Sequence, residues 1–167
     1  MAFALHSFFL LCAISGLLTG VSSVQKTPAK DNNCPKGWRR FDCKCFIYQP
    51  DARMFADAES VCNILGGNVV SIHSAAENAF VHGLFEEGRS FLDFAVWIGL
   101  HDVFEEDKFL WMDGSEFDFD GFDADDDEPS VMSEGVCVSL DEDDARWDTR
   151  MCTTEFTYIC MTDVLTH

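Results

Sequence analysis

The sequence predicts an α+β domain held together by disulfides, and three observations support this fold class. Two segments with the helical spacing of apolar residues come first, at residues 52–67 and 74–85. Short segments rich in β-branched and aromatic residues follow them, which is typical of an antiparallel sheet. Eight cysteines in 167 residues favour a disulfide framework.

The chain begins with the features of a secretory signal peptide at residues 1–23. An apolar run at residues 3–18 is followed by small and polar residues, and it is too short for a membrane span. We therefore expect secretion, with a short polar leader at residues 24–33 and one domain at residues 34–167. No other segment is apolar enough to cross a bilayer, so membrane insertion is not expected.

Both predicted helices carry end signals as well as periodicity. The first has a glycine pair after its apolar positions, which are Phe55, Ala58, Val61, Cys62 and Leu65. The second opens with Ser74 and Glu77, the spacing of a capping box. We expect its buried face to consist of Phe80, Val81 and Leu84.

The predicted strands occupy residues 95–100, 109–112, 136–140 and 156–161. Between Trp111 and Val136 there is almost no regular pattern. A loop of this length in a small domain is usually functional or disordered. The expected architecture is therefore two helices followed by an antiparallel sheet with a long irregular loop.

Acidic residues dominate the charge and gather near this loop. The formal net charge is −19, from 30 acidic and 11 basic residues. Fifteen of the acids lie between Asp113 and Asp148, where Arg146 is the sole base. Such a field repels nucleic acid and anionic lipid and attracts cations, so a nucleic-acid partner is not expected.

Seven short motifs follow one another in the order of a known family. They are CPKGW at 34–38, the helix with Cys62, WIGL at 97–100, EPS at 128–130, CVSL at 137–140, RWD at 146–148 and YIC at 158–160. Together they resemble the C-type lectin domain, from residue 34 to about residue 162. The chain is most similar in style to small secreted fish lectins of the ladderlectin, nattectin and lactose-binding type. The type II antifreeze proteins resemble the same group.

The resemblance implies three disulfides, namely Cys34 with Cys45, Cys62 with Cys160, and Cys137 with Cys152. Cys12 leaves with the signal peptide, so seven cysteines remain, and the odd count requires one thiol that is free or bonded to another chain. That thiol is Cys43. It predicts either a disulfide-linked homo-oligomer or a free thiol.

The resemblance also implies a sugar site. In sugar-binding members, an EPN motif, a later Glu and a WND motif hold calcium, which binds two sugar hydroxyls. Calcium prefers six to eight oxygen ligands. Here Ser130 and Thr149 stand where the family has Asn and Asp. The implied sugar-binding residues are Glu128, Ser130, Glu134, Asp148 and Thr149, and the implied metal ligands are Glu128, Glu134 and Asp148.

Two further features of the loop region have alternatives. Residues 116–127 imitate an EF-hand loop but lack flanking amphipathic helices, so an auxiliary calcium site and a solvated acidic loop both stay open. The aromatic residues Phe117, Phe119 and Phe122 either stack on a sugar or pack beneath the loop, whereas Trp97, Trp111 and Trp147 are expected in the core.

No motif of a hydrolase or metalloprotease is present, so an enzyme is not expected.

We therefore expect a secreted lectin that recognises terminal hexoses, of the galactoside or lactose class by resemblance. Oligomers would provide multivalency and agglutinate microbes at an extracellular surface. Because the ligand set is altered, we expect partial or no calcium dependence. The alternatives are a calcium-dependent mannose-type lectin, an antifreeze protein and an acidic mineral-associated protein.

Overall fold

The described part of the chain begins with two strands that precede both helices. The computed structural model describes residues 34–102, 108–122, 128–130 and 136–164, all within one compact unit. Strands β1 (Arg39–Phe41) and β2 (Lys44–Arg53) form an antiparallel hairpin. The prediction that helices come first was therefore wrong. Pro50 and the charged end of β2 concealed the strand, because both are depleted in strands.

Both predicted helices are present, as α1 (Phe55–Ile64) and α2 (Ala75–Gly88). The predicted cap is confirmed at Ser74, whose hydroxyl accepts from Glu77 N. The Glu77 carboxylate accepts from His73 N, one residue before the backbone N–H that a standard capping box uses. Leu65 is 41% exposed because α1 ends one residue before it. Within the described residues, no helix is long and apolar enough to cross a membrane.

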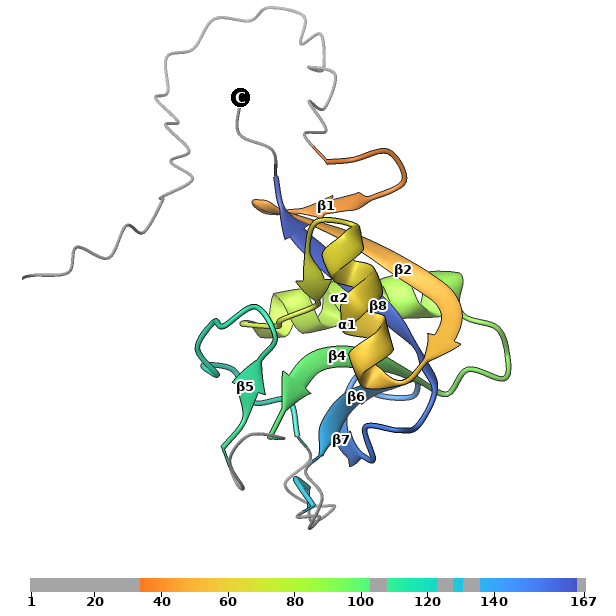
Figure 1. Cartoon of the computed structure of the whole chain (residues 1–167), viewed down its shortest axis with the longest axis vertical. Helices are drawn as coiled ribbons and strands as arrows, with labels where there is room; N and C mark the ends of the chain where they lie inside the picture. The colour runs from red at the N-terminus through yellow and green to blue at the C-terminus, as the bar shows by residue number, and fades with distance from the viewer. Residues whose placement is uncertain (1–33, 103–107, 123–127, 131–135, 165–167) are drawn as a thin grey trace, which may run out of the picture. The chain divides into compact units, whose positions relative to one another are not determined.

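The sheet joins the first strands of the domain to the last one (Figure 1). Its order is β1-β2-β8-β4-β6-β7, with β3 paired to β8 and β5 to β4. The remaining strands are β3 (Asn68–Val69), β4 (Ala95–His101), β5 (Leu110–Trp111), β6 (Cys137–Asp141), β7 (Trp147–Arg150) and β8 (Phe156–Asp163). The sheet is mixed rather than antiparallel, because β4 and β8 are parallel neighbours. The long connection between them makes this possible.

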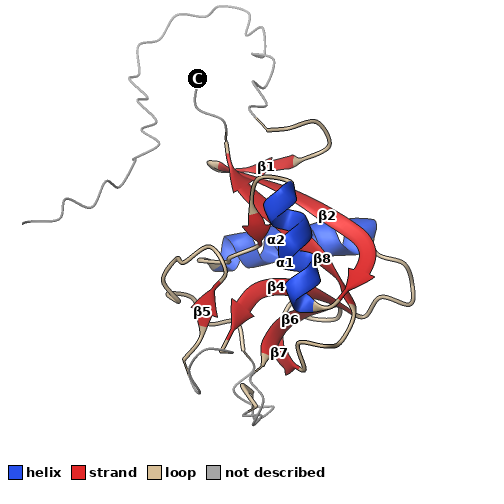
Figure 2. Ribbon diagram, viewed as in Figure 1, coloured by secondary structure: helices blue, strands red, loops and turns tan. Residues whose placement is uncertain are grey.

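Strand β4 is buried along its whole length and separates two apolar clusters. Val96, Ile98 and Leu100 belong to the cluster that includes residues of α2. Ala95 and Trp97 belong to the cluster that includes residues of α1. Since alternate side chains of a strand point to opposite faces, the two helices cover opposite faces of the sheet (Figure 2). The predicted core positions of Trp97 and Trp111 are confirmed.

Three disulfides hold the described elements together. They join Cys34 to Cys45, Cys62 to Cys160, and Cys137 to Cys152, the pairs that the family resemblance implies. Cys43 is also disulfide-bonded, outside these three pairs, so the described residues include no free cysteine. The alternative of a free thiol at Cys43 is therefore not what the structure contains.

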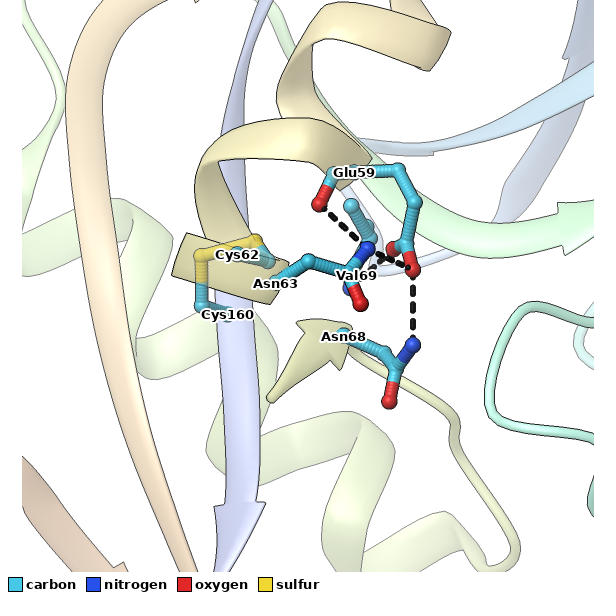
Figure 3. Close-up of a disulfide and its surroundings, with 6 residues drawn as sticks. All are labelled: Glu59, Cys62, Asn63, Asn68, Val69 and Cys160. Carbon is cyan, nitrogen blue, oxygen red and sulfur yellow. Dashed lines mark hydrogen bonds between the residues drawn. A yellow bond between two sulfur atoms is a disulfide. The ribbon is translucent and has the colours of Figure 1, made fainter. Parts of the chain in front are cut away.

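Next to the Cys62–Cys160 disulfide, Glu59 joins α1 to β3 (Figure 3). Its Oε1 accepts from the side chains of Asn63 and Asn68 at 2.7 and 2.6 Å, and its Oε2 accepts from Val69 N at 2.8 Å. Glu59 is 7% exposed, and these bonds satisfy a carboxylate that would otherwise be costly to bury.

Candidate functional site

The candidate site lies beside β7, whose position is fixed by the buried Trp147. The rings of Phe117, Phe119 and Phe122 lie within 6.4 Å of the Trp147 ring. A Cβ added at Gly121 would lie 2.4 Å from the indole, so only glycine fits there. Phe117 is 39% exposed, while Phe119 and Phe122 are half-buried and pack against the core.

These contacts bear on the aromatic residues of the EF-hand-like segment at residues 116–127. All three rings pack around Trp147, as expected for packing beneath the loop, but Phe117 is 39% exposed and remains accessible to a ligand. The acids at residues 123–127, for which an auxiliary calcium site and a solvated loop are the two alternatives, lie outside the described residues. Glu134, the expected later glutamate of the sugar site, also lies outside them.

Glu128 is the centre of a hydrogen-bond cluster that closes the loop onto β7. Its Oε2 accepts from Ser130 N at 2.9 Å, Thr149 N at 3.1 Å and the Thr149 hydroxyl at 2.5 Å. Its Oε1 accepts from the Ser130 hydroxyl at 2.9 Å. A carboxylate has about four lone-pair sites, and here three of the four donors converge on Oε2 while Oε1 accepts one. The two residues that depart from the family pattern, Ser130 and Thr149, provide all four donors.

Asp148 lies on the other face of β7 from Thr149, because neighbouring residues of a strand alternate. Its Oδ2 forms an ion pair with Nη2 of Arg150, which follows two positions later on the same face. The Nε of Arg150 donates to the Ser139 hydroxyl at 3.4 Å. Side-chain exposure is 27% for Asp148 and 33% for Arg150, so the pair remains accessible to a ligand.

The two carboxyl groups have pKa values shifted in opposite directions. Burial alone would raise the pKa of Glu128, but the hydrogen bonds from Thr149 and Ser130 outweigh it and lower the pKa below 4.5. Burial raises the pKa of Asp148 above 3.8, Arg150 opposes this, and the charge of Glu128 adds to it. Glu128 is therefore held as an anion, whereas Asp148 gains a proton more readily than an ordinary aspartate.

The structure brings together four of the five predicted sugar-site residues, but not as one ligand shell. Glu128, Ser130 and Thr149 bond to one another, and Asp148 pairs with Arg150 on the opposite face. Among the described residues, no group of three His, Cys, Asp or Glu side chains could hold a metal ion. Arg150 was missed at the sequence level. Its i+2 spacing from Asp148 on a strand could have indicated the pair.

In a second polar cluster, Ser115, His73 and Asp118 contact one another in turn, like the serine, histidine and aspartate of a hydrolase triad. The Ser115 hydroxyl is 3.1 Å from His73 Nε2, and His73 Nδ1 is 2.7 Å from Asp118. However, the Ser115 hydroxyl also lies 2.5 Å from Asp113, a closer acceptor for its single hydrogen. Its proton is therefore directed away from His73, which is unlike an activated nucleophile. Hydrogen bonds from Ser115 and Ser71 outweigh burial and lower the pKa of Asp113.

Comparison with known proteins shows the family to which this chain belongs. The model of the lectin C-type domain matches residues 51–162, and the chain belongs to this family. The resemblance inferred from the seven motifs is thereby confirmed.

The relatives of this chain include proteins named as lectins and proteins that are not. Human lithostathine-1-beta is 32% identical over 161 residues, covering 93% of this chain and 95% of that protein. The galactose-specific lectin nattectin of Thalassophryne nattereri is 31% identical over 156 residues, covering 91% of each chain. Among solved structures, a calcium-independent type II antifreeze protein is 25% identical with a TM-score of 0.69, covering 79% of this chain and 95% of that one.

Proposed function

We propose that this protein is a secreted lectin that binds terminal hexoses of the galactoside class without requiring calcium. The family binds carbohydrate, and nattectin, at 31% identity, is galactose-specific. The proposed site comprises the loops from Glu128 to Thr149 together with Arg150, the ion-pair partner of Asp148, and Glu134 is a further contributor. Homo-oligomers would agglutinate microbes or cells at an extracellular surface.

The observation that carries this proposal is the engagement of Glu128 by donors of its own chain. Its carboxylate accepts four hydrogen bonds from Ser130 and Thr149, three of them at Oε2, so a calcium ion would compete with protein donors for this carboxylate. The Asp148 carboxylate already has a cation, the Arg150 guanidinium. Both groups that the family uses for calcium therefore have partners within the chain, which supports calcium independence.

Sugar recognition would then fall mainly to the Asp148–Arg150 pair. Asp148 engages Arg150 through Oδ2, which leaves Oδ1 as an acceptor for sugar hydroxyls. Arg150 directs two of its five N–H donors to Asp148 and Ser139 in the described contacts. Bonds to charged groups are roughly twice as strong as neutral ones, so a metal-free site is physically reasonable.

The test is lactose binding measured by calorimetry, with calcium and with a chelator. We expect equal affinity in both conditions and a loss of about tenfold or more for Asp148→Asn and for Arg150→Gln, since each removes a charge-assisted bond. Asp143→Asn removes a nearby charge from the exposed turn and is the matched control. Loss of lactose binding in chelator would show that the site depends on calcium. Binding of mannose instead of lactose, and only with calcium, would support the calcium-dependent mannose-type alternative. Thermal hysteresis and mineral adsorption test the antifreeze and matrix alternatives.

A further inference from the structure

The turn between α2 and β4 presents two large apolar side chains to solvent. Phe91 is 91% exposed and Leu92 is 71% exposed. They occupy the two central positions of a turn, where Gly, Asn, Asp and Ser are the usual residues. In Figure 1 this turn lies at the right-hand edge, where the chain passes from α2 to β4. We refer to Phe91 and Leu92 as the apolar tip.

The apolar tip is held rigidly by hydrogen bonds on both sides of it. The Asp93 carboxylate accepts from Ser90 N at 2.8 Å and from the Ser90 hydroxyl at 2.9 Å, and Asp93 N donates to Ser90 O at 3.1 Å. The Arg89 guanidinium donates to Asp93 O at 3.0 Å and forms ion pairs with Glu86 and Glu142. An exposed apolar pair on a pre-ordered turn can bind a partner with little loss of conformational entropy.

The same chain also has a pocket whose lining is mainly apolar, like the apolar tip. It has a volume of about 380 Å³ and is lined mainly by Met54, Phe55, Ala56, Met112 and the Cys137–Cys152 disulfide. Glu59 also lines it, but its carboxylate is engaged by Asn63, Asn68 and Val69 N (Figure 3). A pocket of this size has room for one or two large apolar side chains.

The apolar tip and the apolar pocket lie at opposite ends of β4. The tip comes just before Ala95, where β4 begins, and His101, where β4 ends, lines the pocket. A strand of this length spans roughly 20 Å. Because β4 is buried and paired on both sides, the tip cannot reach the pocket of its own chain.

We propose that the apolar tip of one copy inserts into the apolar pocket of a second copy. The contact joins two different surfaces, so copies can associate through it head to tail in rings or open chains, or reciprocally in a two-fold dimer. It is smaller than a standard interface of about 1,600 Å², so the association is weak and requires a high protein concentration. The proposal does not depend on sugar binding, although the resulting oligomers would raise the avidity of any sugar site.

Charge gives the association a characteristic salt dependence. Each copy has a net charge of −19, so copies repel one another at low ionic strength. Salt screens this repulsion and leaves apolar contacts intact, and sulfate strengthens them. Association should therefore increase with salt, whereas an interface made of ion pairs would weaken.

The experiment is sedimentation velocity of the secreted chain over a range of concentrations, after removal of any covalent dimer. Phe91→Ser with Leu92→Ser removes the tip, and Ala56→Trp fills the pocket from an exposed position on α1. Ile64→Ser is the matched control, because Ile64 is 85% exposed but belongs to neither surface. We expect both interface variants to be monomeric and the control to associate like the unmodified chain.

Mixing the two monomeric variants provides the decisive result. One variant retains its pocket and the other retains its tip, so the mixture should form a 1:1 dimer that does not extend further. Thr153→Trp is a second pocket-filling variant, for use if circular dichroism shows that Ala56→Trp is unfolded. Unchanged association of the tip variant, or two folded variants that do not dimerise on mixing, would overturn the proposal.

Discussion

At the scale of single residues, two substitutions change the chemistry of the site. Ser130 and Thr149 place hydroxyl and backbone donors around Glu128, where the family pattern has calcium ligands. The sequence could predict that the ligand set was altered, because the motifs EPS and WDT depart from EPN and WND. It could not predict that Asp148 and Thr149 face opposite sides, because the predicted strands do not include β7.

Replacing Glu128 should destabilise the domain rather than only weaken ligand binding. Glu128→Ala leaves the Thr149 and Ser130 donors without their acceptor, at a cost of about 1–3 kcal/mol. Chemical denaturation of the variant and of Glu128→Gln, which retains an acceptor oxygen, measures this cost. An unchanged midpoint for Glu128→Ala would show that these bonds contribute nothing to stability.

The lowered pKa of Glu128 predicts a pH window for this stability. A carboxylate whose folded pKa is below its unfolded value stabilises the fold above that value. The stabilisation is lost as the pH falls through the folded pKa, here below about 4.5. The stability difference between the unmodified chain and Glu128→Gln should therefore shrink below this pH. A difference that stays constant down to pH 2 would contradict the assignment.

At the scale of elements, local signals predicted the helices well and the first strands poorly. The capping pair Ser74 and Glu77 and the apolar spacing of α1 are local, so the sequence contains them. Strand β2 depends on pairing with β8, more than 100 residues away, and its Pro50 and charged end do not indicate a strand. The exposed tip at Phe91 was also missed, since apolar residues in a sequence do not reveal their exposure.

Two glycines in different elements should respond in opposite ways to alanine. A Cβ at Gly121 would overlap the Trp147 ring, so Gly121→Ala should cost about 1–3 kcal/mol through overpacking. Gly83 lies inside α2 with open space around it, so Gly83→Ala should stabilise by about 0.5–1 kcal/mol. Thermal unfolding of both variants tests this contrast, and equal shifts would refute it.

At the scale of the whole molecule, the disulfides close loops of very different length. Cys62 and Cys160 are 98 residues apart, whereas Cys34 and Cys45 are 11 apart. On a chain-entropy estimate the long loop contributes about 4.7 kcal/mol and the short one about 3 kcal/mol or less. Replacing Cys62 and Cys160 by Ser should therefore lower stability more than replacing Cys34 and Cys45. The reverse order in denaturant titrations would mean that strain or packing, not loop length, decides.

The cysteine count makes a separate prediction for the secreted chain. In the structure Cys43 is disulfide-bonded outside the three described pairs. Residues 24–167 contain seven cysteines, an odd number, so removal of residues 1–23 prevents all of them from pairing within one chain. We propose that Cys43 then links two secreted chains. Non-reducing electrophoresis should show a dimer that collapses with a thiol reagent and is missing in Cys43→Ser. A covalent dimer that persists in this variant would assign the link to another cysteine.

The pairing of β2 with β8 also has a consequence for biosynthesis. Lys44 lies opposite Asp163, so the centre of the sheet contains β8, the last of the described strands to be made. While the ribosome is still adding β8, β2 and β4 each lack a neighbour, and Cys62 has no Cys160 to meet. Such non-local pairing slows folding and leaves apolar strand edges exposed in the growing chain. The domain therefore cannot complete its sheet until β8 has left the ribosome, and a nascent chain that stalls before β8 should remain a substrate for chaperones.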